Sequence, residues 1–271
     1  MIGFDGDPTR EADLRAALTG LLAIFPEHLA KARPPTWFDA DEMVRNDLFD
    51  AILRAHRKER LALPIQALRA TGAPYHGFER MHLRRLAWFV PSLLASWLDR
   101  APGPGDEPFG AADLEAILGG TTTDEVDDGE WTDDEAAALA AFFEVALDAA
   151  LATPLREART SDLVRPLEDG LRVWSLHSPS VPLEVVRVAR AFGLDLDPLV
   201  ERWSLDPSPL ALDHLLEAVF DTTLPVKHYL SHEAVADRLA DAFFEASGDR
   251  ALRLSKADAT VRRNIARRVE E

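Results

Sequence analysis

The sequence predicts an all-α protein, and three observations support this fold class. Hydrophobic residues recur at intervals close to 3.6 residues along nearly the whole chain, as in amphipathic helices. A sustained alternation of apolar and polar residues, which is typical of strands, occurs in no segment. The breaks between periodic segments are short and contain Gly and Pro, as connections between antiparallel helices do. We therefore expect a repeat-like array of antiparallel helix pairs.

The first hundred residues contain four apolar stripes at helical spacing. Asp7 and Pro8 are typical of an N-cap and a first helical position, and they precede a stripe formed by Leu14, Leu18, Leu21, Leu22 and Phe25. The second stripe consists of Met43, Val44, Leu48, Ile52 and Leu53, and the third of Leu61, Ile65 and Leu68, ahead of Gly72. The fourth stripe runs from Leu83 to Trp97 and contains Pro91. Because a proline ring clashes with the preceding turn, we expect two helices that meet near Phe89.

The rest of the chain continues the helical pattern. Gly119 and Gly120, followed by three threonines, predict a turn, and Thr132 with Glu135 matches a capping box at the start of a helix. Further helices are predicted from stripes that begin near Leu163, Val185, Leu199 and Leu212, and from segments that begin at Ser231 and Ser255. Ser231 is the predicted N-cap of its helix.

The length of 271 residues corresponds to one large domain or two small ones. We expect an N-terminal helical part over residues 1–105 and a C-terminal helical part over 106–271, or one continuous domain formed by both. Leu139–Glu144 (LAAFFE) resembles Leu239–Glu245 (LADAFFE), which suggests two pseudo-duplicated halves. The alternative is that Leu, Ala and Phe are simply common on helix surfaces.

The negative charge is concentrated in one region. The net charge is −17, and residues 101–160 hold 15 acidic side chains against two basic ones. Such a field repels phosphate backbones, so we expect no nucleic-acid partner and instead a protein with a basic surface. Two basic tracts, over residues 54–60 and 262–268, are interpreted as the solvated surfaces or ends of helices.

Composition excludes several classes of site. The chain has no cysteine, which excludes disulfides, thiolate zinc sites and a cysteine nucleophile. No apolar run approaches the roughly 20 residues of a membrane span, and the first residues lack a signal pattern. We therefore expect a cytoplasmic protein without a membrane partner, and no motif indicates a cofactor.

Three segments carry a resemblance to known proteins. They are Leu86–Leu98 (LAWFVPSLLASWL), Trp131–Leu151, where a tryptophan precedes a capped helix with paired phenylalanines, and Leu199–Trp203. They resemble a bacterial family of all-helical proteins with no assigned function, whose members combine an aromatic-x-x-Pro-x-Leu-Leu helix with a later Trp-then-acidic helix. The resemblance spans roughly residues 75–250. It implies a helical fold and a bacterial source, and it implies no activity and no catalytic residue.

The acidic segment is the main candidate site. It contains Asp124, Glu125, Asp127, Asp128, Glu130, Asp133 and Asp134. Aligned with a calcium loop, Asp124, Asp128 and Glu135 take positions one, five and twelve, but Val126 at position three cannot coordinate a cation. Acidic residues are also expected wherever a helix begins, because they favour the N-terminal dipole. The segment is thus a surface for a basic partner, a calcium loop or a solvated helix start.

Histidines provide a second set of candidates. His228 and His232 have the i, i+4 spacing of metal ligands on one helix, and Glu79 with His82 matches half of a di-iron motif. Convergence of these residues with His76 and Asp221 would indicate an enzyme site. Arg80, Arg84 and Arg85 form either the basic face of a helix or part of a pocket for an anion.

Taken together, the patterns favour a non-enzymatic helical interaction module, immunity- or inhibitor-like, with an acidic surface for a basic protein. The alternatives are a metal-dependent helical-bundle enzyme and a calcium-binding module through residues 124–135. No residue is predicted to be catalytic.

Overall fold

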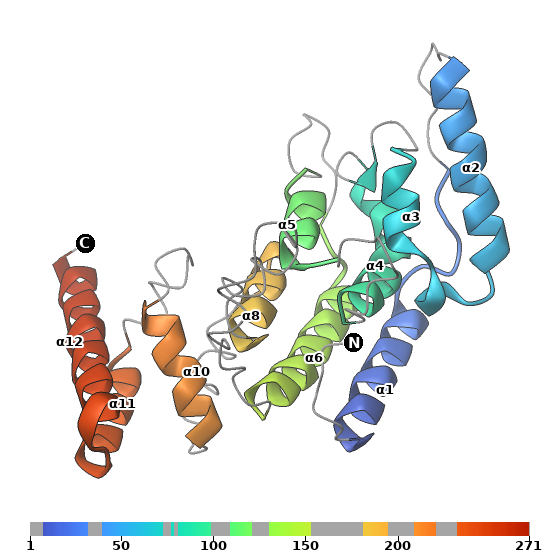
Figure 1. Cartoon of the computed structure of the whole chain (residues 1–271). Coiled ribbons are helices and arrows are strands. Elements are labelled where there is room, and N and C mark those ends of the chain that lie inside the picture. Colours follow the sequence, from blue (N-terminus) through green and yellow to red (C-terminus); the bar gives the residue numbers. More distant parts are fainter. Residues whose placement is uncertain are drawn as a thin grey trace, which may run out of the picture. The chain divides into compact units, whose positions relative to one another are not determined.

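The computed structural model describes residues 8–31, 40–72, 77–78, 81–98, 109–120, 130–152, 181–194, 209–220 and 232–270. Within these ranges all regular secondary structure is helical, which confirms the predicted all-α class (Figure 1). The repeated pairing of helices stays a prediction. Across the same ranges, no helix combines the length and the apolar character needed to cross a membrane.

The chain divides into two compact units. The first comprises Met1–Ala146 with Ala191–Leu194, and the second comprises Leu147–Arg190 with Asp195–Glu271. The expected division at residues 105 and 106, and the alternative of one continuous domain, stay predictions.

The first unit is built around α4. Its helices are α1 (Pro8–Ile24), α2 (Ala40–His56), the 3-10 helix η1 (Arg60–Ala62), α3 (Ile65–Ala70), α4 (Leu83–Leu98), α5 (Ala111–Gly120) and most of α6 (Asp133–Leu151). Phe89 of α4 meets the ring of Phe78 at a centroid distance of 4.9 Å and that of Phe49 at 6.2 Å. The ring of Trp97, about two turns further along α4, lies 6.3 Å from the ring of Phe143 in α6, measured between centroids. Helix α4 thus forms the centre of the apolar core.

The predicted break at Pro91 is wrong, because α4 continues through it. Proline removes one backbone N–H from the helix and disturbs the carbonyl groups of the preceding turn. Here the carbonyl of Trp88, in that turn, accepts a hydrogen bond from the guanidinium of Arg60. Ser92, which follows the proline, donates from its hydroxyl to the carbonyl of Arg60 at 2.8 Å. Helix α4 thus stays continuous where the local rule predicts an interruption, and residues on both sides of Pro91 contact Arg60 of η1.

Arg60 is not part of a solvated surface, which corrects the interpretation of the tract over residues 54–60. Its Nη1 donates to the carbonyl of Pro26 at 3.1 Å, and its guanidinium lies 4.8 Å from the ring centroid of Trp88. Burial lowers the pKa of Arg60 below its ordinary value, and the nearby carboxylate of Glu27 partly opposes this effect. The side chain of Arg60 therefore connects η1 to α4 and to the chain that follows α1.

We expect Arg60→Met to lower the free energy of unfolding of the first unit by about 2 kcal/mol, because two partly buried carbonyls lose their charged donor. Urea unfolding followed by circular dichroism would measure this change. Arg57→Met is the matched control, since Arg57 is exposed and its loss should change stability by less than about 0.5 kcal/mol. Equal effects of the two substitutions would contradict the structural role of Arg60.

Helix α5 was not predicted, and Gly119 with Gly120 forms its last turn rather than a loop. Leu114, Ile117 and Leu118 are buried. The carboxylate of Asp113 accepts a hydrogen bond from the backbone N–H of Gly110 at 2.7 Å and also pairs with Arg69 of α3. Asp113 thus stabilises α5 in two ways, by capping its first turn and by pairing with Arg69 of α3, although the helix ends in two glycines.

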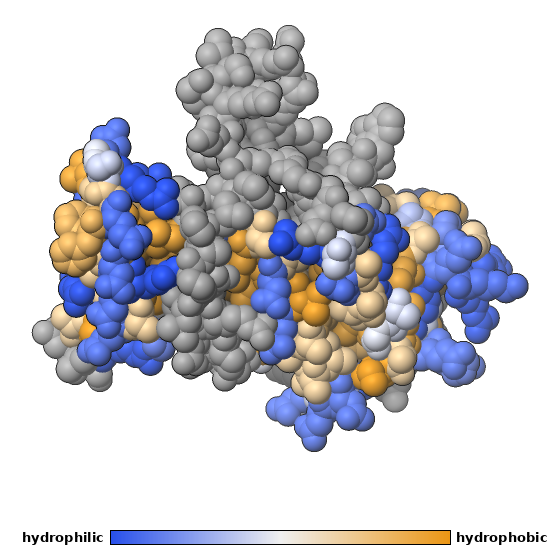
Figure 2. Space-filling view, turned by 90° about the horizontal axis from the view of Figure 1, so that it is seen from below, coloured by the Kyte–Doolittle hydropathy of each residue, from blue (hydrophilic) through white to orange (hydrophobic). Residues whose placement is uncertain are grey.

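The predicted stripe on α2 is only partly internal. Phe49 is the buried residue of this helix, whereas Met43, Val44 and Leu48 are 59%, 68% and 54% exposed. Other large hydrophobic side chains that are exposed are Ile24, Phe220, Phe243, Phe244 and Leu252. Figure 2 shows one face of the molecule, on which hydrophobic and hydrophilic residues lie interspersed over the described part. The surface is therefore not uniformly polar.

The second unit contains α8 (Val181–Ala191, except its last residue), α10 (Pro209–Phe220), α11 (Glu233–Glu245) and α12 (Gly248–Glu270). Helix α11 buries Val235, Ala236 and Leu239, and α12 packs along it and also contacts α10. The tight turn between α11 and α12 requires a positive φ of 60° at Gly248, which a residue without Cβ adopts readily. Helix α12 thus begins seven residues before the predicted start at Ser255.

The two similar Phe-Phe segments differ in burial. Phe142 and Phe143 are buried in the first unit, while Phe244 of the second unit is 82% exposed. The suggested duplication therefore stays a prediction, and the sequence likeness does not extend to equivalent packing of these rings.

Candidate functional site

The described part of the acidic segment lies at the start of α6, where a capping box is formed. The backbone N–H of Thr132 donates to Oε2 of Glu135 at 2.9 Å, and the backbone N–H of Glu135 approaches Oγ1 of Thr132 at 3.3 Å. Both interactions satisfy N–H groups that have no partner within a helix. The capping box predicted from the sequence is confirmed.

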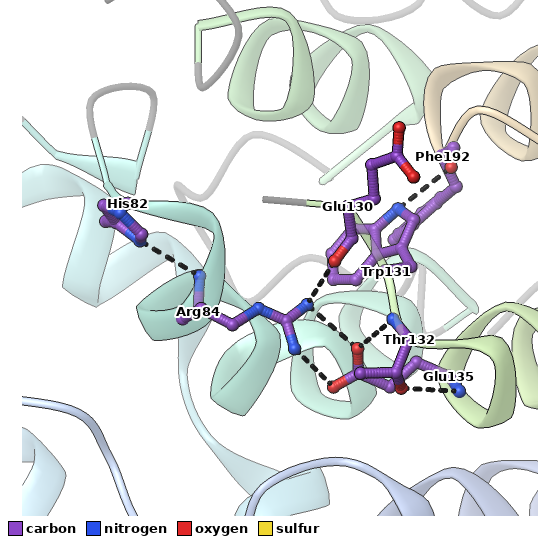
Figure 3. Close-up of polar contacts among 7 residues, drawn as sticks. All are labelled: His82, Arg84, Glu130, Trp131, Thr132, Glu135 and Phe192. Carbon is purple, nitrogen blue, oxygen red and sulfur yellow. Dashed lines mark hydrogen bonds and ion pairs between the residues drawn. The ribbon is translucent and has the colours of Figure 1, made fainter. Parts of the chain in front are cut away.

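Glu135 has a second role, which connects α6 to α4. Its Oε2 and Oε1 accept hydrogen bonds from Nη2 and Nη1 of Arg84 at 2.9 and 3.2 Å (Figure 3). Nη2 also donates to the carbonyl of Glu130 at 3.2 Å. The side chain of Glu135 is 5% exposed and that of Arg84 is 36% exposed. The anion that meets the basic face around Arg84 is thus a carboxylate of the protein itself.

Trp131 anchors the segment that leads into α6. Its indole Nε1 donates to the carbonyl of Phe192 at 3.0 Å. Its ring lies 6.0 Å from the ring of Phe25 and 5.9 Å from that of Phe192, and the Arg84 guanidinium lies 5.9 Å from its centroid. Figure 3 shows Trp131 between Phe192 and the Arg84–Glu135 pair. The residue directly before the capping box is therefore packed against two phenylalanine rings and the guanidinium of Arg84.

The other acidic residues at this position face solvent. Glu130, Asp133 and Asp134 are exposed, and none of the three carboxylates forms an ion pair within the part of the chain that the structure describes. Asp133 and Asp134 are in the first turn of α6, where negative charge is favoured by the helix dipole. Asp124, Glu125, Asp127 and Asp128 lie outside the described residues.

Two of the histidine candidates are described, and they belong to different units of the chain. His82 lies directly before α4, and its Nδ1 accepts a hydrogen bond from the backbone N–H of Arg84 at 3.3 Å. His232 is the N-cap of α11, which corrects the predicted cap at Ser231 by one residue. His76, Glu79, Asp221 and His228 lie outside the residues that are described. His82 and His232 therefore occupy helix starts.

Within the same coverage, no group of three or more His, Asp or Glu side chains is arranged to hold a metal ion. Of the proposed calcium ligands, only Glu135 is described, and both of its carboxylate oxygens accept hydrogen bonds from Arg84.

Arg84 approaches Glu135 from 51 residues away in the chain, so no local sequence pattern predicts this contact. The sequence indicates a basic cluster of Arg80, Arg84 and Arg85, but it does not indicate that Glu135 is the partner of Arg84. Arg85 donates to the carbonyl of Ala30 at 2.8 Å. No local pattern distinguishes these two neighbouring arginines.

Compared with models of protein families, with curated proteins and with solved structures, the chain shows no match, and the resemblance to a bacterial all-helical family stays a prediction.

Proposed function

We propose that this protein is a non-enzymatic interaction module that binds a basic protein partner through the acidic surface at the start of α6. The acidic surface is defined by Glu130, Asp133 and Asp134, and we propose that it continues into Asp124, Glu125, Asp127 and Asp128. In its narrowest form, the module is an inhibitor or an immunity-like protein that covers the basic surface of a nuclease.

The observation that supports this proposal is the division of roles among the acidic residues. Glu135 caps α6 and pairs with Arg84, so the structural requirement for a carboxylate at this helix start is met by one residue. Glu130, Asp133 and Asp134 remain exposed beside it. Such carboxylates keep their hydration and their long-range field, which favours rapid association with a cationic surface.

A defined probe tests the proposal, namely a peptide of about 20 residues rich in Lys and Arg, titrated against the full chain by fluorescence anisotropy. We expect binding to weaken steeply with added salt, because exposed charges are screened beyond about 8 Å at physiological ionic strength. The triple variant Glu130→Gln, Asp133→Asn, Asp134→Asn should bind about tenfold more weakly, as expected for the loss of three exposed charge pairs.

The matched control is the triple variant Asp241→Asn, Glu245→Gln, Asp249→Asn, which removes three negative charges from exposed positions of the second unit. This variant should bind the peptide nearly as tightly as the natural chain. If both triple variants lose affinity equally, the peptide senses only net charge and the acidic surface at α6 is not the site. Binding that is insensitive to salt would also contradict the proposal.

A further inference from the structure

Helix α2 carries two stripes on opposite sides, one buried or half-buried and the other exposed. The inner stripe consists of Glu42, Asn46, Phe49, Leu53 and His56, which are buried or half-buried. The outer stripe consists of Val44, Leu48, Ala51 and Ala55, which are all exposed. Figure 1 shows α2 at the margin of the first unit. The outer stripe is thus an apolar helix face that no helix of the described ranges covers.

The spacing of the outer stripe is that of a coiled-coil seam. Its members are separated by four, three and four residues, which corresponds to the d, a, d and a positions of a heptad. Val44 and Leu48 are 68% and 54% exposed. Exposed apolar side chains in a continuous row mark interaction sites. A helix of 17 residues with one buried side chain also has little stability of its own.

We propose that α2 is a homodimer interface, in which α2 packs against α2 of a second copy of this chain in antiparallel orientation about a two-fold axis. In this pairing Leu48 of one copy faces Ala51 of the other, and Val44 faces Ala55. The large side chains of one helix therefore lie opposite the small ones of its neighbour. A two-fold interface requires such self-complementarity, because each contact occurs twice.

The charges beside the seam favour the same partner and the same orientation. Asp47 and Arg54 are exposed, lie on one side of the seam at g positions, and form no ion pair within the described ranges. In an antiparallel pair, g positions face g positions, so Asp47 of each copy faces Arg54 of the other. A parallel pair would place Asp47 opposite Ile52, with no gain in charge complementarity.

Sedimentation equilibrium of the full chain tests the dimer. We expect the mass to rise to twice that of one chain with increasing concentration, and Leu48→Glu to weaken association at least tenfold, because each copy would bury a carboxylate in the seam. Leu252→Glu is the matched control, since Leu252 of α12 is 55% exposed and lies on another helix. It should leave association unchanged. A single-chain mass at every concentration, or equal loss in both variants, would overturn the proposal.

The ion pairs are tested by a charge exchange. Asp47→Arg should weaken the dimer, because the new arginine would face Arg54 of the second copy, and the addition of Arg54→Asp should restore it. A double variant that dimerises no better than the single one would therefore overturn the assigned pairing.

The orientation of the two α2 helices is tested by disulfide formation. The chain has no cysteine of its own, so any disulfide must involve the introduced residues. A mixture of the Val44→Cys and Ala55→Cys variants should form a mixed disulfide on oxidation, whereas Val44→Cys alone should stay unlinked. A disulfide between two Val44→Cys chains would show parallel helices and overturn the antiparallel arrangement. None of these substitutions changes the acidic surface, so failure here and failure of the proposed function are distinguishable.

Discussion

Replacement of Trp97 by alanine is expected to lower the free energy of unfolding of the first unit by about 4 kcal/mol. Trp97 is fully buried in α4, and its ring packs against that of Phe143 in α6. The substitution removes the largest fully buried side chain of the described residues and leaves a cavity that the surrounding helices fill only in part. Urea unfolding, followed by circular dichroism at fixed protein concentration, would measure the loss.

The control for Trp97→Ala is Phe244→Ala, another truncation of an aromatic side chain. Phe244 is 82% exposed, so its removal should cost less than about 0.5 kcal/mol. If both substitutions had similar effects, burial of Trp97 could not be the cause of the loss. An unfolding midpoint unchanged by Trp97→Ala would contradict the central position of α4.

Glu135→Ala is expected to cost roughly 3 kcal/mol, because it removes the buried carboxylate of an ion pair and half of a capping box. The variant would leave the guanidinium of Arg84 without its carboxylate and the backbone N–H of Thr132 without its acceptor. Glu135→Gln should cost less, since an amide oxygen still accepts from Thr132. The same urea unfolding experiment would rank the two variants.

A double-mutant cycle separates the ion pair from the cap. Arg84→Ala combined with Glu135→Ala should cost at least 1 kcal/mol less than the sum of the single substitutions, because the two side chains interact directly. Asp134→Ala is the control from the same helical turn, and its exposed carboxylate should contribute less than about 1 kcal/mol through the helix dipole. Additive single effects would show that Arg84 and Glu135 do not stabilise one another.

The parts of the fold that were predicted correctly depend on short-range chemistry. The capping box at Thr132 and Glu135 involves two residues three positions apart, so the sequence alone contains the whole interaction. The first helix likewise begins at Pro8, where the fixed φ of proline suits a first helical position. Periodicity identified most of the described helices for the same reason.

The errors arise where distant groups determine the outcome. Helix α4 continues through Pro91, and residues on both sides of the proline contact Arg60, which lies 28 or more residues away in the chain. Arg84 finds its carboxylate on another helix, and Asp113 of α5 pairs with Arg69 of α3. On α2, periodicity identified an apolar stripe but could not tell that Phe49 faces inward while Val44 and Leu48 face outward. Only the tertiary arrangement decides which stripe is internal.

The contrast between α2 and α4 implies a gradient of local opening within the first unit. Helix α4 is enclosed along most of its length, so its backbone amides are released to solvent only when the unit as a whole unfolds. Helix α2 has Phe49 as its buried residue and an inner stripe that is otherwise half-buried, so we expect it to fray while the rest of the unit stays intact. A second chain packed against the outer stripe would suppress this fraying. Dimer formation would therefore slow the local opening of α2 and leave that of α4 unchanged.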